Sequence, residues 1–198
     1  KELIKMSIGL TALERIARAR SDFRMGVGVV LCLGKDQWLA APSETVTAER
    51  FLAMREMGAI ELTITDWRAQ TLSTWATDGD IARLALPHDK GLDWVRSVCD
   101  PSDDFNAPLK GPFTPIFGGI AEAHRTALAI CKMALLLPSA VLVNVSGQDL
   151  KGIDFIDLKL ISKAMESSIN QLTEVSVANV PLKVSNASRV HVFRPQDC

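Results

Sequence analysis

The 198-residue chain is 47% hydrophobic and 23% charged, which is typical of a globular protein with one substantial core. Its 22 basic and 23 acidic residues leave a formal charge of -1, so no broad field favours nucleic acid or an anionic membrane surface. The longest apolar stretch, residues 127–137, contains Lys132 and is shorter than the roughly 20 residues of a membrane helix. We therefore expect neither nucleic acid nor a membrane as a partner.

The first half of the chain alternates helix and strand signals. Thr11 and Glu14 form a capping box that predicts a first helix. An apolar run over residues 26–33 predicts a buried strand, which a short turn joins to a second strand over 37–41. Five further elements are predicted in this half: a helix over 48–57, a strand over 59–65, a helix over 66–72, a strand over 81–86 and a helix over 92–98.

The second half begins with an irregular segment, residues 101–119, that is rich in Pro and Gly. Because helices alternate with strands through both halves, we predict an α/β fold, a three-layer α-β-α domain with a mixed sheet. The later predicted elements are a helix over 120–136, a strand over 140–145, a helix over 157–168 and two strands over 174–177 and 188–193.

Few side chains carry a pattern that indicates catalysis. The sequence has no glycine-rich phosphate loop of a standard type. His124 lies on the apolar stripe of the helix over 120–136, which favours a structural role, although an imidazole also suits acid–base work near neutral pH. The glycine pair at 118–119 and the carboxylates within 100–104 fit ordinary loop residues better than a phosphate or cation site.

The cysteines show no spacing that indicates a zinc site or a redox pair. Thiols inside apolar segments behave as small hydrophobic groups, which favours a reducing cytoplasm. The four residues are Cys32, Cys99, Cys131 and Cys198.

Four segments of the chain resemble one enzyme family. Residues 12–41 are similar to its first helix and strands, and residues 44–54 to a helix with a V-T-P-E-x-x-x-x-M pattern. Residues 99–105 resemble an A-D-P-x-x-x-x-D-F segment, and residues 129–145 resemble D-L-A-R-L-A-G-L-P-P-A-A-V-I-C-E-I. The family is 3,4-dihydroxy-2-butanone 4-phosphate synthase of the riboflavin pathway. The resemblance covers most of residues 10–165 and implies the fold of that family.

The chain departs from the family where the chemistry lies. Active synthases bind magnesium and rearrange ribulose 5-phosphate, with an acidic D-x-E-D-R-E-x-E-G-D loop between the first two strands. Residues 34–37 stand there, and one carboxylate beside a lysine cannot replace several hard oxygen ligands. Residues 58–63 replace the cysteine turn G-R-G-L-I-C, and Asn144 replaces a strand glutamate.

A last family segment, G-H-T-E-A, corresponds to residues 121–127 with a gap of one residue. The match makes His124 the candidate catalytic residue and Arg125 and Thr126 the candidate substrate-binding residues. We expect a domain without synthase activity and with no metal or other cofactor in this segment. The alternative is an active, divergent synthase acting on ribulose 5-phosphate or a related sugar phosphate.

Residues 174–197 resemble the junction after such a domain in bifunctional riboflavin proteins, where GTP cyclohydrolase II begins with an A-x-L-P-T pattern. The resemblance implies a synthase-like domain over 1–170 and a linker with first strands over 171–198, leading toward a zinc-binding cyclohydrolase domain. It further implies a cytoplasmic homodimer in which the synthase-like domain has a structural, dimerisation or regulatory role. The interface candidates are three loop aromatics, Phe105, Phe113 and Phe117.

Overall fold

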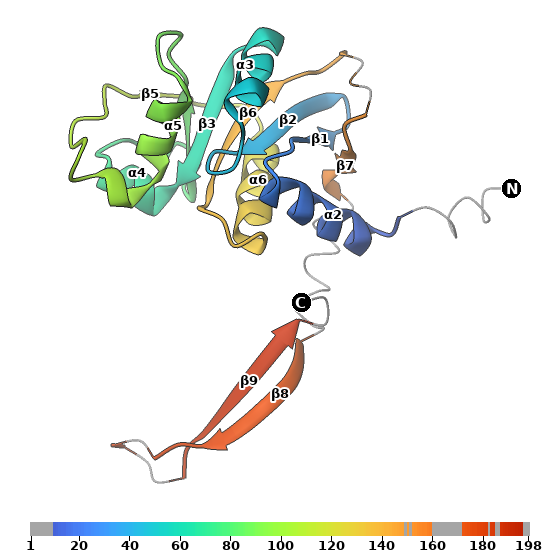
Figure 1. Ribbon diagram of the computed structural model, residues 1–198, viewed down its shortest axis with the longest axis vertical. Helices are drawn as coiled ribbons and strands as arrows, with labels where there is room; N and C mark the ends of the chain where they lie inside the picture. Colours follow the sequence, from blue (N-terminus) through green and yellow to red (C-terminus); the bar gives the residue numbers. More distant parts are fainter. Residues whose placement is uncertain are drawn as a thin grey trace, which may run out of the picture. The chain divides into compact units, whose positions relative to one another are not determined.

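The computed structural model describes residues 10–148, 150, 152–159, 172–181, 183–184 and 187–195 (Figure 1). The chain forms two compact units. The larger spans residues 18–158, and the smaller comprises residues 1–17 and 159–198.

A seven-stranded mixed sheet organises the larger unit, with strand order β5-β4-β3-β6-β2-β1-β7. Neighbouring strands are antiparallel except β1 and β7, which are parallel. The sheet confirms the predicted mixed α/β fold. The strands are β1 Val29–Leu33, β2 Asp36–Pro42, β3 Ile60–Thr65, β4 Ile81–Ala85, β5 Thr114–Pro115, β6 Ser139–Asn144 and β7 Phe155–Asp157.

Helices cover both faces of this sheet. Side chains along a strand alternate between the two faces, so the sheet packs against helices on both sides. On one face Leu62 and Ile64 of β3 belong to a core cluster with Phe51 and Val95, which lie on two of the helices. On the other face Glu61 contacts helix α6. The helices are α2 Ala12–Arg24, α3 Ala48–Met57, α4 Asp66–Thr71, α5 Leu92–Cys99 and α6 Glu122–Met133, with a 3-10 turn, η1, at Pro101–Asp103.

Local sequence signals explain where several helices begin. The predicted capping box is confirmed: Thr11 N–H donates to the Glu14 carboxylate at 2.7 Å, and Glu14 N–H donates to the Thr11 hydroxyl at 3.2 Å. Thr47 caps α3 and Thr65 caps α4 in the same way, each accepting a hydrogen bond from a backbone N–H three residues later. The predicted hairpin is also confirmed, since β1 and β2 pair from Leu33 opposite Asp36.

Three predictions for the second half need correction. The helix over 120–136 is shorter at both ends, and Leu135 has a φ of 60°, which an α-helix does not contain. The segment over 101–119 includes strand β5. Asp157, expected to begin a helix, ends strand β7 opposite Cys32, because the parallel pairing with β1 extends the chain there. Leu158 and Lys159 are helical, so the predicted helix begins one residue later. Residues 160–168 of that predicted helix lie outside the described residues.

The smaller unit contains an antiparallel hairpin of β8 Leu172–Asn179 and β9 Arg189–Pro195. Both strands are longer than predicted, and the side chains described on them are exposed. The domain boundary at residue 170 stays a prediction. Within the described part of the chain, every helix is too short or too polar to cross a bilayer.

Candidate functional site

The candidate catalytic residue, His124, lies in the first turn of α6 and is fully buried, with 0% of its surface exposed. Its Nε2 lies 2.8 Å from Oε2 of Glu61 on β3. The indole of Trp38 on β2 meets the imidazole edge-on, with ring centroids 4.8 Å apart. Three elements from distant parts of the sequence therefore enclose one imidazole.

The hydrogen bond to Glu61 assigns the tautomer of His124, because a carboxylate accepts and Nε2 must then donate. Nδ1 is left with no hydrogen-bond partner among the described residues. The hydroxyl of Thr63, two positions along β3 from Glu61 on the same sheet face, is also buried without a partner in that part of the chain. An imidazole oriented by a carboxylate has the form of a general base, but a base must reach its substrate, and this ring has no exposed surface.

The two candidate substrate-binding residues do not join His124. Arg125 Nε donates to both Asp80 carboxylate oxygens at 2.9 and 3.0 Å, and its Nη2 donates to the Asp78 carbonyl at 3.0 Å. Thr126 is half-buried and lies two positions after His124, so the two side chains point from different sides of α6. The three candidate residues are adjacent in sequence, but the helix directs their side chains to different partners: His124 contacts Glu61, and Arg125 contacts Asp80.

A second ion pair fixes the loop that leads into α6. Arg83, which is 3% exposed, donates to the Asp78 carboxylate at 2.8 and 3.1 Å and to the Gly118 carbonyl. Burial alone would raise the pKa of Asp78, but hydrogen bonds from Arg83 and Thr77 outweigh it and lower that pKa. This arrangement holds residues 118–119 as a structural joint.

The tip of the β1–β2 hairpin carries little chemistry. It is a two-residue turn, Gly34-Lys35, and both residues are exposed together with Asp36. Gly34 has a φ of +65°, which glycine adopts without strain. Across the sheet Asn144 pairs with Trp38, and its Oδ1 accepts a hydrogen bond from Ser146 N–H at 3.0 Å. The side chain at the position of the family glutamate is thus engaged in a turn.

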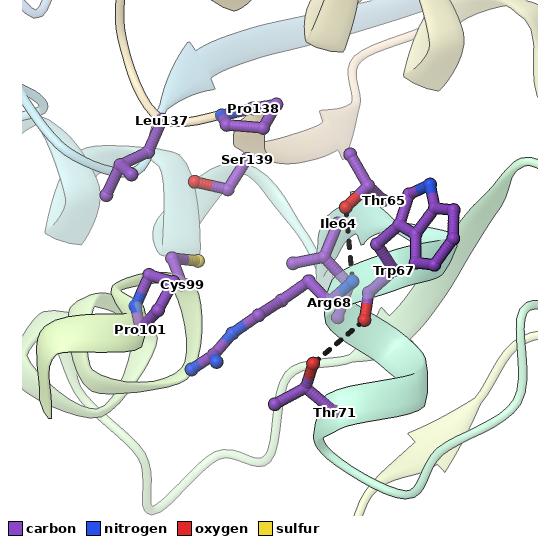
Figure 2. Close-up of a pocket in the computed structure, with 10 residues that line it drawn as sticks. All are labelled: Ile64, Thr65, Trp67, Arg68, Thr71, Cys99, Pro101, Leu137, Pro138 and Ser139. Atoms are coloured by element: carbon purple, nitrogen blue, oxygen red, sulfur yellow. Dashed lines mark hydrogen bonds between the residues drawn. The ribbon is translucent and has the colours of Figure 1, made fainter. Parts of the chain in front are cut away.

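A cavity of about 250 Å³ lies at the opposite end of the sheet, where β3 ends and β6 begins (Figure 2). Trp67, Pro101, Leu137 and Pro138 supply apolar walls, and Arg68 runs between them. The sequence analysis missed this cavity, because its lining comes from segments up to 75 positions apart. Nothing in the sequence pattern indicated it.

The loop next to this cavity is held by a three-residue charge cluster. Arg68 donates to both carboxylate oxygens of Asp104 at 2.6 and 2.7 Å, and Lys110 Nζ also donates to that carboxylate. These hydrogen bonds hold the pKa of Asp104 well below its usual range. The carboxylates within 100–104 therefore include a structural anchor, Asp104, rather than only solvated loop residues.

No known family model matches the chain, and no curated protein matches it in sequence. Solved structures share its fold. A 3,4-dihydroxy-2-butanone 4-phosphate synthase in its cation-free form aligns with a TM-score of 0.58 at 16% identity, over 78% of this chain and 98% of that one. The synthase of Candida albicans aligns with a TM-score of 0.55 at 13% identity, over 76% and 96%.

A third structure extends the alignment along this chain. RibBX, a two-domain 3,4-dihydroxy-2-butanone 4-phosphate synthase from A. baumannii, aligns with a TM-score of 0.57 at 10% identity and covers 91% of this chain. This chain spans 66% of that protein. At such identities the likeness shows the fold alone, and the chain has a fold like that of the synthase.

One similar synthase structure is described in complex with two magnesium ions. The residues present here do not fit such a site. Among the described residues, no three His, Cys, Asp or Glu side chains gather where they could hold a metal ion. Asp36 is a single carboxylate beside Lys35 in the exposed turn, and Nε2 of His124 is bonded to Glu61.

Proposed function

We propose that this chain is a synthase-like domain that has lost synthase chemistry and has a structural, dimerisation or regulatory role in a riboflavin biosynthesis protein of the GTP cyclohydrolase II type. One observation carries the proposal. The surviving candidate for acid–base catalysis, His124, is fully buried and bonded to Glu61 beneath Trp38. A sugar phosphate cannot reach an imidazole in that state.

The hairpin tip supports the same conclusion. Magnesium takes oxygen ligands, and carboxylates are the protein groups that best supply them. The turn at residues 34–37 offers one carboxylate next to a cation, and Asn144 offers an amide that is used by Ser146. Neither position therefore supplies the net negative charge that would hold a magnesium ion against a hydroxy-ketone.

The β8–β9 hairpin supports attachment to a further domain. A lone two-stranded hairpin is marginally stable in water, and both edges of this one are unpaired among the described residues. Val177 and Val192 are 45% and 48% exposed. The alignment with a two-domain protein also covers more of this chain than the two alignments with single synthase chains described above. We propose a cyclohydrolase domain as the continuation of this sheet.

The loop aromatics support a homodimer through two of the three candidates. Phe105 is 96% exposed and Phe117 is 71% exposed. Phe113 instead packs on Trp94 with ring centroids 6.0 Å apart and contacts the core of its own domain. We expect Phe105→Ala with Phe117→Ala to weaken a dimer measured by sedimentation, and a matched Phe113→Ala variant to lower stability instead. An unchanged dimer in the double variant would remove these residues from the interface.

An active divergent synthase is the second candidate, and the carboxylate-oriented imidazole of His124 favours it. The deciding assay incubates the purified chain with ribulose 5-phosphate and magnesium and detects product, with a known synthase as the positive control. The proposal expects no turnover above that of heat-treated protein. Turnover by the native chain that disappears in His124→Ala would favour the second candidate. Arg125→Ala is the companion variant, which we expect to keep the fold.

A further inference from the structure

The cavity of Figure 2 is separate from the position of His124. In the β3–β6 register Glu61 pairs with Leu142 near the end of β6, whereas Ile64 pairs with Ser139 at its beginning. Ile64 and Ser139 line the cavity, and Glu61 contacts His124. Glu61 and Ile64 thus lie near opposite ends of β3, and their odd spacing points the two side chains to opposite faces of the sheet, so a ligand in the cavity would not use the synthase-type site.

The cavity walls are fixed before any ligand binds. Arg68 Nε donates to the Val98 carbonyl at 2.7 Å, and its two Nη atoms donate to Asp104, which ties α4 to α5 and the loop that follows it. Ser139 bonds to the buried hydroxyl of Ser43. A preformed cavity binds with less loss of conformational entropy than one that a ligand must order.

The shape of the walls favours a flat ring. Pro101 and Pro138 present rigid rings, Leu137 is aliphatic, and the indole of Trp67 lies across the cavity from Pro101 and Leu137 (Figure 2). Trp67 is 75% exposed, so the protein core does not account for its position. Indole and proline rings stack well on planar ligands. A cavity of about 150 Å³ holds one benzene ring, and drug-sized pockets begin near 300 Å³, so about 250 Å³ suits one or two fused rings.

The polar groups favour a neutral ligand with one acceptor. Among the described residues that line the cavity, Arg68 is the charged side chain, and its guanidinium is already bonded to the Asp104 carboxylate and the Val98 carbonyl, so the cavity presents no unpaired charge to a ligand. The Thr65 hydroxyl accepts the N–H of Arg68 at 3.2 Å, which leaves its own hydrogen available to an acceptor on a ligand. The Thr71 hydroxyl donates within α4, to the Trp67 carbonyl at 3.0 Å.

We propose that this cavity binds a small, planar, neutral aromatic molecule of one or two fused rings, with a carbonyl or ring nitrogen that accepts a hydrogen bond from Thr65. The ring lies between Trp67 and the two proline rings. Such a site at the far end of the sheet from His124 is suited to an effector rather than to a substrate of synthase chemistry.

Coumarin, a neutral bicyclic lactone, is the probe. We titrate it into the full chain and monitor binding through the indole N–H signals of the four tryptophans by NMR. We expect saturable binding with a dissociation constant of about 0.1–5 mM, the range for a ligand of this size. The signal of Trp67 shifts and that of Trp75 does not. Trp75 is the matched control, because it is 74% exposed and does not line the cavity.

Three variants localise the binding. Trp67→Ala weakens coumarin binding at least about fivefold, and Trp75→Ala leaves it unchanged. Thr65→Val weakens it a few-fold, and Thr65→Ser, which keeps both the hydroxyl and the helix cap, restores it. The proposal is overturned if coumarin shows no saturable binding at concentrations up to 10 times the upper end of the expected range of dissociation constants. It is also overturned if the two tryptophan variants change the dissociation constant equally, or if the NMR shifts centre on Trp38.

Discussion

The buried His124–Glu61 contact makes a quantitative prediction about stability. Glu61→Leu places at this position the residue of the family G-R-G-L-I-C pattern and removes the acceptor of the His124 Nε2 hydrogen. The imidazole is fully buried and its Nδ1 has no partner in the described residues, so the variant leaves both ring nitrogens unsatisfied. An orphaned buried polar group costs about 1–3 kcal/mol.

Glu61→Gln is the matched comparison, because the amide oxygen still accepts from Nε2 and only the charge is lost. We expect it to cost about 0.5–1.5 kcal/mol. Urea unfolding, followed by tryptophan fluorescence and by circular dichroism, gives both free energies of unfolding, and Trp38 reports directly on the ring of His124.

A double-mutant cycle with His124→Phe isolates the contact itself. In that background Glu61→Leu should cost at least about 1 kcal/mol less than in the native chain, since the donor is gone. The reasoning is refuted if Glu61→Leu is as stable as the native protein, or if its cost is the same with Phe at position 124.

Two further perturbations test the structural framework. Asp104→Asn should cost about 2–3 kcal/mol near pH 7, because it leaves the buried Arg68 and Lys110 without their counter-charge. The pKa of Asp104 is lowered in the folded protein, so its stabilisation is present above the ordinary aspartate pKa and is lost as pH falls through the folded pKa. We therefore expect the difference in unfolding free energy between the native protein and the variant to narrow below about pH 4 and not above pH 7. Urea unfolding at several pH values measures this difference. Gly26→Ala should prevent stable folding, because the φ of Gly26 is +67° and an added Cβ would lie 2.2 Å from a backbone carbonyl oxygen. Gly34→Ala should cost only about 1 kcal/mol, because Gly34 has a similar φ of +65° but open space around it. Equal melting temperatures of the two variants would contradict this account.

Much of the fold was predictable, because its signals are local. The Thr11 capping box and the run, turn and run of the β1–β2 hairpin each depend on residues close in sequence. Strand β7 was missed because three residues carry no clear period, and its conformation depends on pairing with β1 more than 120 positions earlier.

The candidate site was predictable in part. A motif match indicated His124, but its contact with Glu61 spans 63 positions, and nothing in a single sequence reports such a pairing. The same match suggested that Arg125 shares the site, although the carboxylate of Asp80 holds that side chain elsewhere. The cavity beside Trp67 was not predictable, because its walls come from the ends of several elements.

The most direct test of the central claim is a comparison of turnover and ring accessibility in one preparation of the folded chain. Ribulose 5-phosphate with magnesium should give no product above background, and the His124 imidazole should resist acylation by diethyl pyrocarbonate until urea unfolds the protein, since the ring has no exposed surface. Product formation that is lost in His124→Ala, together with rapid acylation of His124 in the folded chain, would contradict the account.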